Sequence, residues 1–383
     1  MNILIVGSLN TIFLKSYKCI FESLGHNVYV GNTSDLKFVE KDGFNFFSGE
    51  KAKTTDKLRR LARLFQLDNF NFFWKIVESR EYKARLDACK IDEVEKFVIN
   101  AKIDLVFFFW GTTLKKELRC LNEIKQKNCL SYKMILCVNT YPVRYILPKE
   151  ITKNSIGYLS KDLDYFDKFD SVICPNKKMS DLLEYGIGIK SKIFIRPDFL
   201  HYSFFSSATA ANVQKIKRSV VFLGNVDFGK RNLDDVSKTL LSIADMGIDV
   251  WVQSPCKLEH KHVKTFAPFT YEQIARGELG DFIRQFTASI VIYNNFNNLR
   301  TSLGYPTRFA LATLGGGYIL LPSGTFDGIE ESLDKKQLSA IKLFKSIEHL
   351  YQIILELDEL PSPNFSKSFT NIPEYDFNQI LNN

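Results

Sequence analysis

Short apolar runs that end in glycine, asparagine or proline recur along this chain, and they constrain its fold more than any other feature. The first run, residues 2–6 (NILIV), ends at Gly7. A helical stretch then leads to Gly25 and to a second apolar run at 26–30. Strand, loop, helix and strand in this order form a βαβ unit, and repeated units of this kind build a parallel sheet.

Similar runs follow in two series. The first series continues at 105–109, 134–138 and 171–174, and the second lies at 219–223, 250–252, 289–293 and 318–321. The small-residue stretch 206–211 (SSATAA) separates them and is typical of a linker. Because each series starts afresh, the sequence predicts two α/β domains with parallel sheets. We expect the domains to span 1–205 and 206–360, with a C-terminal tail at 361–383.

Composition narrows the classes of partner. The net charge of +8, with 51 Lys plus Arg against 43 Asp plus Glu, suits anionic ligands such as nucleotide diphosphates or acidic lipids. The basic residues are dispersed and form no recognised nucleic-acid module, so no nucleic acid is expected as a partner. The seven cysteines include no CxxC pair, and no tetrahedral ligand set is recognised around the close pair His260 and His262. We therefore expect reduced thiols and no metal site.

Two features bear on location. The N-terminal apolar run is too short for a signal peptide, and no run reaches 18 apolar residues, so we expect a cytoplasmic protein. Residues 51–65 place Leu58, Leu61 and Phe65 at helical spacing among several cations. Such a basic amphipathic helix can lie on an anionic membrane surface, here the inner face of the cytoplasmic membrane, or it can pack its leucines on the domain core. Both interpretations stay open.

The first candidate binding segment follows the predicted strand at 219–223. Gly224 and Asn225 end this strand, and Lys230 and Arg231 come a few residues later. Exposed amides at a glycine turn together with two cations can hold a diphosphate. The alternative is an ordinary strand-to-helix turn with solvated cations.

The second segment is TSLGYPTRF at 301–309, which precedes an apolar helical run and three glycines at 315–317. Ser302 or Thr307 can cap the helix, and the helix dipole and Arg308 then point to the same small volume. A phosphate would be held there without a metal ion. The three glycines are interpreted as close helix-to-strand packing.

In order and spacing, these segments resemble the C-terminal donor domain of group 1, GT4-like glycosyltransferases, closest to the spore-maturation-type subgroup. The resemblance is carried by FLGN with GKRN and by YPTRFALATLGGGYILLP, and it covers roughly residues 170–330. It implies the GT-B fold, in which two Rossmann-like domains face each other across a cleft. It further implies a metal-independent, hexosyltransferase-type enzyme (EC 2.4) that uses a UDP- or GDP-linked sugar as co-substrate and no cofactor.

The resemblance also assigns residues to the donor. Within these motifs the implied donor-binding residues are Gly224, Asn225, Lys230, Arg231, Ser302, Tyr305, Pro306, Thr307 and Arg308, and Gln253 with Ser254 would lie near the base. The expected acceptor is a glycan or lipid-linked sugar in cell-surface polysaccharide or glycoconjugate synthesis. The first domain would bind it.

One departure from the family bears on mechanism. Ala310 stands where the family usually carries a glutamate that contacts the donor, which favours an inverting or atypical reaction. Inversion needs a general base in the first domain, and Asp162, with Asp164 beside it, is the candidate, with a solvated helix face as the alternative. Two rival functions stay open: a nucleotide-sugar epimerase on the same fold, and a non-catalytic nucleotide-sugar-binding protein.

Overall fold

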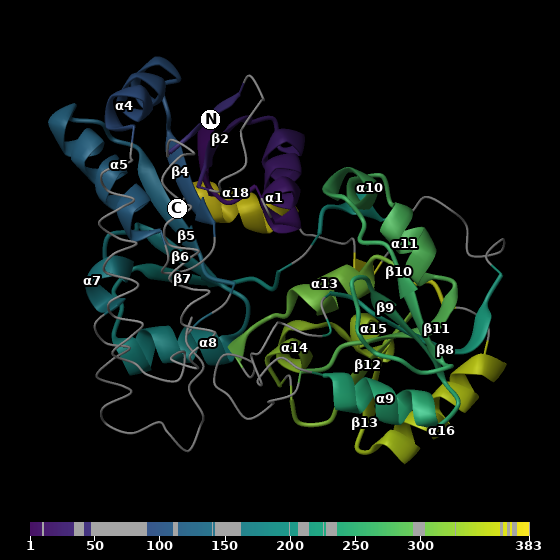
Figure 1. The fold of residues 1–383 in the computed structure, drawn as a ribbon. Helices are drawn as coiled ribbons and strands as arrows, with labels where there is room; N and C mark the ends of the chain where they lie inside the picture. Colours follow the sequence, from purple (N-terminus) through teal and green to yellow (C-terminus); the bar gives the residue numbers. More distant parts are fainter. Residues whose placement is uncertain are drawn as a thin grey trace, which may run out of the picture. The chain divides into compact units, whose positions relative to one another are not determined.

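The protein contains two parallel β-sheets, each accompanied by helices (Figure 1). The chain clusters into two compact units: the first comprises Met1–Val138, Lys161–Ile173 and Gly188–Ile193, and the second comprises Asn139–Ser160, Cys174–Ile187 and Phe194–Asn383. The computed structural model describes residues 1–9, 11–33, 42–46, 90–109, 114–139, 141, 162–198, 200–205, 214–224, 226, 236–293, 303–325, 327–360, 363–365, 368–369 and 374–382. The predicted α/β class with two parallel sheets is confirmed.

The first sheet has seven strands in the order β3-β2-β1-β4-β5-β6-β7. Its direction of winding reverses between β1 and β4. The strands are β1 (Asn2–Gly7), β2 (Asn27–Asn32), β3 (Gly43–Asn45), β4 (Leu105–Phe109), β5 (Lys133–Cys137), β6 (Ser171–Cys174) and β7 (Lys192–Ile195). The described helices of the first unit are α1 (Ile12–Ser23), α4 (Ile91–Asn100), α5 (Lys115–Lys127) and α7 (Leu163–Phe166). Helix α8 (Lys177–Asp181) follows β6 in the chain and runs into a π-helix, η5 (Leu182–Ile187), and both belong to the second unit.

Aromatic residues build much of the first core. All five residues of β4 (LVFFF) are buried, as expected for a strand covered on both faces. Helix α1 packs Tyr17 and Phe21 on Phe107 of this strand, with ring centroids 5.0 and 5.2 Å apart. Aromatic pairs at such separations add to the gain from burial.

The second sheet has six strands in the order β10-β9-β8-β11-β12-β13. Its strands are β8 (Ile216–Phe222), β9 (Asp249–Gln253), β10 (Val263–Phe266), β11 (Phe286–Ile290), β12 (Tyr318–Pro322) and β13 (Ile341–Phe344). Its helices are α9 (Ser237–Asp245), α10 (Tyr271–Ala275), α11 (Glu278–Ile283), α13 (Thr307–Thr313), α14 (Asp327–Ser332), α15 (Lys335–Ser339), α16 (Ile347–Glu359) and α18 (Glu374–Asn382), and a short 3-10 turn, η6 (Tyr202–Phe204), precedes them.

The winding of the second sheet defines one special position. From β8 the chain adds β9 and β10 on one side, and from β11 it adds β12 and β13 on the other. The neighbouring strands β8 and β11 therefore form the topological switch point, and their carboxyl ends are where ligands bind in open α/β sheets. Helices α9 and α16 bury one face of this sheet, and α11 and α13 contact β11 and β12 (Figure 1).

One predicted strand is displaced. The sequence predicted a strand at 289–293, whereas β11 spans Phe286–Ile290. Thr287, the second residue of β11, is polar and interrupts the apolar pattern at the start of the strand. Its hydroxyl is satisfied because it donates a hydrogen bond of 2.6 Å to Asp358 Oδ1. Residues 291–293 are apolar because the chain stays near the sheet, where Val291 N still donates to Leu320 O at 3.0 Å.

Among the residues that the structure describes, no helix combines the length and the apolar character needed to cross a bilayer. Residues 51–65, predicted to form a basic amphipathic helix, lie outside the described part of the chain.

Candidate functional site

The carboxyl end of β8 turns at a glycine. Gly224 follows two residues after Phe222 and has φ of 105°, a backbone conformation that favours glycine. A Cβ atom at this position would lie 3.1 Å from Nε of Arg308. The missing side chain therefore lets the backbone and the guanidinium approach closely.

Arg308 is buried at this turn, with 6% of its surface exposed. Its guanidinium carbon lies 4.6 Å from the ring centroid of Phe222 and 4.6 Å from that of Tyr293. Its Nη1 donates a hydrogen bond of 3.1 Å to Ile292 O. Two rings, a carbonyl and the Gly224 backbone thus fix the position and the orientation of this cation.

This arrangement stands at the switch point of the second sheet. Phe222 ends β8 and pairs with Ile290 of β11, and Tyr293 follows three residues beyond. A guanidinium carries five N–H donors in a planar fork that matches the oxygens of a phosphate. The site can therefore bind an anion at the position where α/β folds hold their ligands.

The structure brings together Gly224 and Arg308, which come from the two different segments that the sequence analysis singled out. Their role in donor binding stays a prediction. Asn225, Lys230, Arg231 and Ser302 lie outside the described residues.

Thr307 does not cap the helix that carries Arg308, so this part of the prediction is wrong. Helix α13 begins at Thr307, and its N-cap is Pro306, which has extended dihedral angles and no side-chain hydrogen-bonding group. Thr307 lies inside the first turn, past the position from which a side chain caps. Tyr305, just before the cap, is buried and packs edge-on against Phe309 at 5.2 Å.

Gln253 and Ser254, predicted near a base, lie at the carboxyl end of β9. Gln253 is half-buried and ends the strand. The backbone N and the Oγ of Ser254 both donate to Phe266 O, at 2.8 and 3.0 Å. The Ser254 hydroxyl thus joins β9 to β10, and contact of either residue with a base stays a prediction.

A buried polar group near Tyr305 was not predicted. Asp198 is 3% exposed, and burial raises the pKa of its carboxyl well above the ordinary 3.8, while a hydrogen bond with Asn139 acts in the opposite direction. Burial, and then the nearby Asp198, raise the pKa of Tyr305. Asn176, two residues after the end of β6, donates a hydrogen bond through Nδ2 to Leu303 O at 2.8 Å. The one usable sequence signal was the placement of Asn139 and Asn176 just after two strands.

Asp162, the predicted general base, is engaged in an ion pair. Its Oδ1 lies 3.1 Å from Lys115 Nζ, and 17% of its side chain is exposed. It precedes α7 without capping that helix through its side chain. The pairing ties α5 to α7, and a catalytic role for Asp162 stays a prediction.

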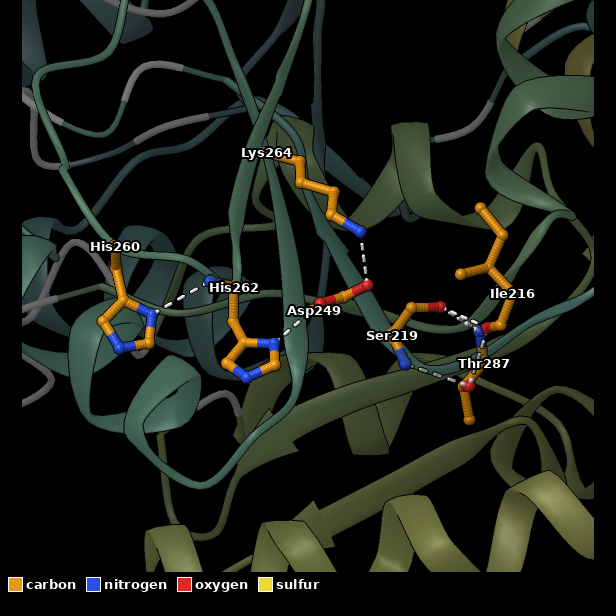
Figure 2. Close-up of polar contacts among 7 residues, drawn as sticks. All are labelled: Ile216, Ser219, Asp249, His260, His262, Lys264 and Thr287. Atoms are coloured by element: carbon orange, nitrogen blue, oxygen red, sulfur yellow. Dashed lines mark hydrogen bonds and ion pairs between the residues drawn. The ribbon is translucent and has the colours of Figure 1, made fainter.

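The histidine pair belongs to a polar cluster at the amino ends of β9 and β10 (Figure 2). Asp249 accepts from both sides, with His262 Nδ1 at 2.9 Å from Oδ1 and Lys264 Nζ at 2.6 Å from Oδ2. His260 accepts from the backbone N of His262 at 3.1 Å. Among the described residues, no group of three or more His, Cys, Asp or Glu side chains is arranged to hold a metal ion.

The glycines after α13 allow close packing at Gly315, but the neighbour is helix α11 and not the predicted strand. A Cβ on Gly315 would overlap Ile283 of α11, whereas a Cβ on Gly317 would meet no atom within 4 Å. Ala310, which the sequence resemblance aligns with a glutamate, is 2% exposed on α13.

Two solved structures are similar to this chain over its whole length. The sucrose-phosphate synthase from Thermosynechococcus elongatus matches with a TM-score of 0.56 and 8% identity, covering 100% of this chain and 94% of that one. A glycosyltransferase from Rickettsia africae matches with a TM-score of 0.52 and 9% identity, covering 100% and 94%. No family model matches the chain. No curated protein matches its sequence. At such identities the likeness concerns the fold, and the predicted GT-B fold is confirmed.

Proposed function

We propose that this protein is a metal-independent glycosyltransferase that binds the diphosphate of a UDP- or GDP-linked sugar at Arg308. The observation that carries the proposal is a buried, fixed guanidinium at the switch point of the second sheet, beside a glycine with positive φ. The GT-B fold adds support, because two solved structures that share it carry the names of sugar-transferring enzymes.

The chemistry asked of Arg308 is stabilisation of the leaving group. When a glycosidic bond to a nucleotide breaks, negative charge grows on the departing diphosphate. A fixed cation in a site from which water is excluded stabilises this charge without reorganising during the reaction. Gly224 contributes by letting the backbone approach the same point. In this proposal, Lys230 and Arg231 supply further charge.

The finer features of the proposal concern the acceptor. We propose a hexosyl transfer to a glycan or lipid-linked sugar in cell-surface polysaccharide or glycoconjugate synthesis. Residues 51–65 would hold the enzyme on the inner face of the cytoplasmic membrane. These features rest on the sequence resemblance and on the basic amphipathic pattern.

A second candidate is a nucleotide-sugar-binding protein without transferase activity. Ala310 favours it, because this methyl group stands where the family carries a donor-contacting carboxylate, and the position is buried in α13. Such a protein would bind the nucleotide sugar through Arg308 and release it unchanged.

The decisive test is nucleotide binding by calorimetry with UDP and GDP. We expect Arg308→Ala to weaken the binding by about 10- to 100-fold, the value of a charge-assisted hydrogen-bonding group. The matched control is Arg276→Ala, since Arg276 is 65% exposed and pairs with Glu278 at 2.7 Å. Equal affinity of Arg308→Ala and the wild type would refute the site.

Activity separates the two candidate functions. The wild type is incubated with nucleotide sugars and a panel of glycan and lipid-linked acceptors in the presence of EDTA. Transfer to an acceptor supports the enzyme. Tight nucleotide binding without transfer or hydrolysis supports the binding protein instead.

A further inference from the structure

We propose that Tyr293 is a positioning residue for the phosphate site: its ring and that of Phe222 form an aromatic clamp on the guanidinium of Arg308 and fix the plane in which that group meets a ligand. The inference rests on the proposed function. It adds a residue that belongs to neither of the two segments from which the site was predicted.

The clamp lies beside the centre of the sheet. Phe222 is the last residue of β8, and Tyr293 follows three residues after the end of β11, the strand that pairs with β8. Each ring centroid lies 4.6 Å from the guanidinium carbon. Tyr293 directly follows Ile292, whose carbonyl accepts from Nη1 at 3.1 Å. Two successive residues thus restrain both the plane of the guanidinium and its rotation within that plane.

Such restraint matters for an arginine that binds an anion. A long side chain loses rotamer freedom when it meets a ligand, and a side chain that is already fixed avoids most of this loss at the moment of binding. Cation–π attraction is strongest when the cation is removed from water, and Arg308 is only 6% exposed. Lysine cannot replace it, because an ammonium group neither stacks on rings nor offers a planar fork.

The test compares Tyr293→Phe with Tyr293→Leu by calorimetry with UDP and GDP. Phenylalanine keeps the ring face, so we expect affinity within about twofold of the wild type. Leucine is apolar but smaller and has no ring, and we expect affinity about tenfold weaker. Binding at the wild-type affinity in Tyr293→Leu would overturn the clamp.

A double-mutant cycle separates positioning from general structural support. In a protein that already carries Arg308→Lys, the planar group is gone, so we expect Tyr293→Leu to change the remaining affinity by less than about twofold. If the leucine variant loses the same factor in both backgrounds, Tyr293 acts independently of Arg308 and the inference is wrong.

A measurement without ligand keeps this inference distinct from the proposed function. The Nε–H resonance of Arg308 is assigned in a ¹⁵N NMR spectrum by its disappearance in Arg308→Lys. We expect ring currents to shift it in the wild type and in Tyr293→Phe, and we expect it to move towards the position of exposed arginines in Tyr293→Leu. If the wild type binds no nucleotide while this resonance behaves as expected, the proposed function fails and the clamp stands. A resonance that is unmoved in Tyr293→Leu removes the clamp whatever the nucleotide does.

Discussion

At the scale of single residues, Asp198 makes a prediction about pH. Its folded-state pKa is raised by burial above the ordinary 3.8, so the folded protein holds this proton more tightly than the unfolded chain does. The stability that the protonated carboxyl contributes is complete below the unfolded-state pKa and is lost as pH rises through the folded-state pKa. Asp198→Asn keeps a neutral side chain of the same shape and has no proton to lose. We therefore expect its free energy of unfolding, relative to the wild type, to rise with pH by at most about 1.4 kcal/mol per pH unit.

Urea unfolding of both proteins from about pH 5 to pH 8 measures this difference directly. Taking the difference cancels the opposite contributions of Glu95, Asp249 and Glu348, whose carboxyl pKa values are lowered and which are present in both proteins. A difference that stays flat or falls with pH would show that the carboxyl of Asp198 is ionised in the folded state.

At the scale of elements, the sequence predicted the strands in the interior of both sheets and none at their edges. The central strands contain apolar runs because much of each strand is buried, and β4 and β6 are buried throughout. The strands that sequence reasoning missed are β3, β7, β10 and β13, which end the two sheets. β7 (KIFI) and β10 (VKTF) are half-exposed and short, so polar residues interrupt their patterns. A run of four mixed residues carries too little information to be distinguished from a loop.

The residues of the candidate site also divide into those that local sequence signals indicate and those that such signals miss. Gly224 and Arg308 could be proposed from the sequence because a glycine after a strand and an arginine in the first turn of a helix are local signals. Tyr293 and Asp198 were not, because their roles depend on contacts between segments far apart in the chain. The capping role predicted for Thr307 failed because Pro306 takes the cap position one residue earlier.

The contact between α11 and the end of α13 makes a prediction at this scale. A Cβ at Gly315 would overlap Ile283, so we expect Gly315→Ala to lower the free energy of unfolding by about 1–3 kcal/mol, the usual cost of overpacking. Gly317→Ala is the matched control, because its Cβ meets no atom within 4 Å. Urea unfolding measures both, and combining Gly315→Ala with Ile283→Ala should recover part of the loss. Equal stability of the two glycine variants would contradict the packing.

At the scale of the whole molecule, the end of the chain is integrated into the second compact unit. Arg196, before the second sheet begins, places its guanidinium 3.8 Å from the ring centroid of Phe377 in α18. Phe377 has no exposed surface. Residues between α16 and α18 contact the region around α13 in the same unit. Phe365 N donates to Gly316 O at 2.8 Å, and the ring centroids of Phe369 and Phe309 lie 6.5 Å apart. The segment at 361–383, predicted as a tail, thus reaches the helix that carries Arg308.

This integration predicts that a change in α18 destabilises the protein as a whole. Phe377→Ala removes a fully buried ring and leaves the Arg196 guanidinium without its aromatic contact, so we expect the free energy of unfolding to fall by about 3–5 kcal/mol. Asn378→Ala, on the exposed side of the same helix, should change it by less than about 0.5 kcal/mol. Because a domain has only about 5–15 kcal/mol in total, deleting residues 361–383 should abolish cooperative unfolding or lower its midpoint further than Phe377→Ala does. Thermal and urea unfolding of the three proteins provide the comparison. A truncated chain that unfolds at the wild-type midpoint would mean that α18 contributes nothing to the stability of the second unit.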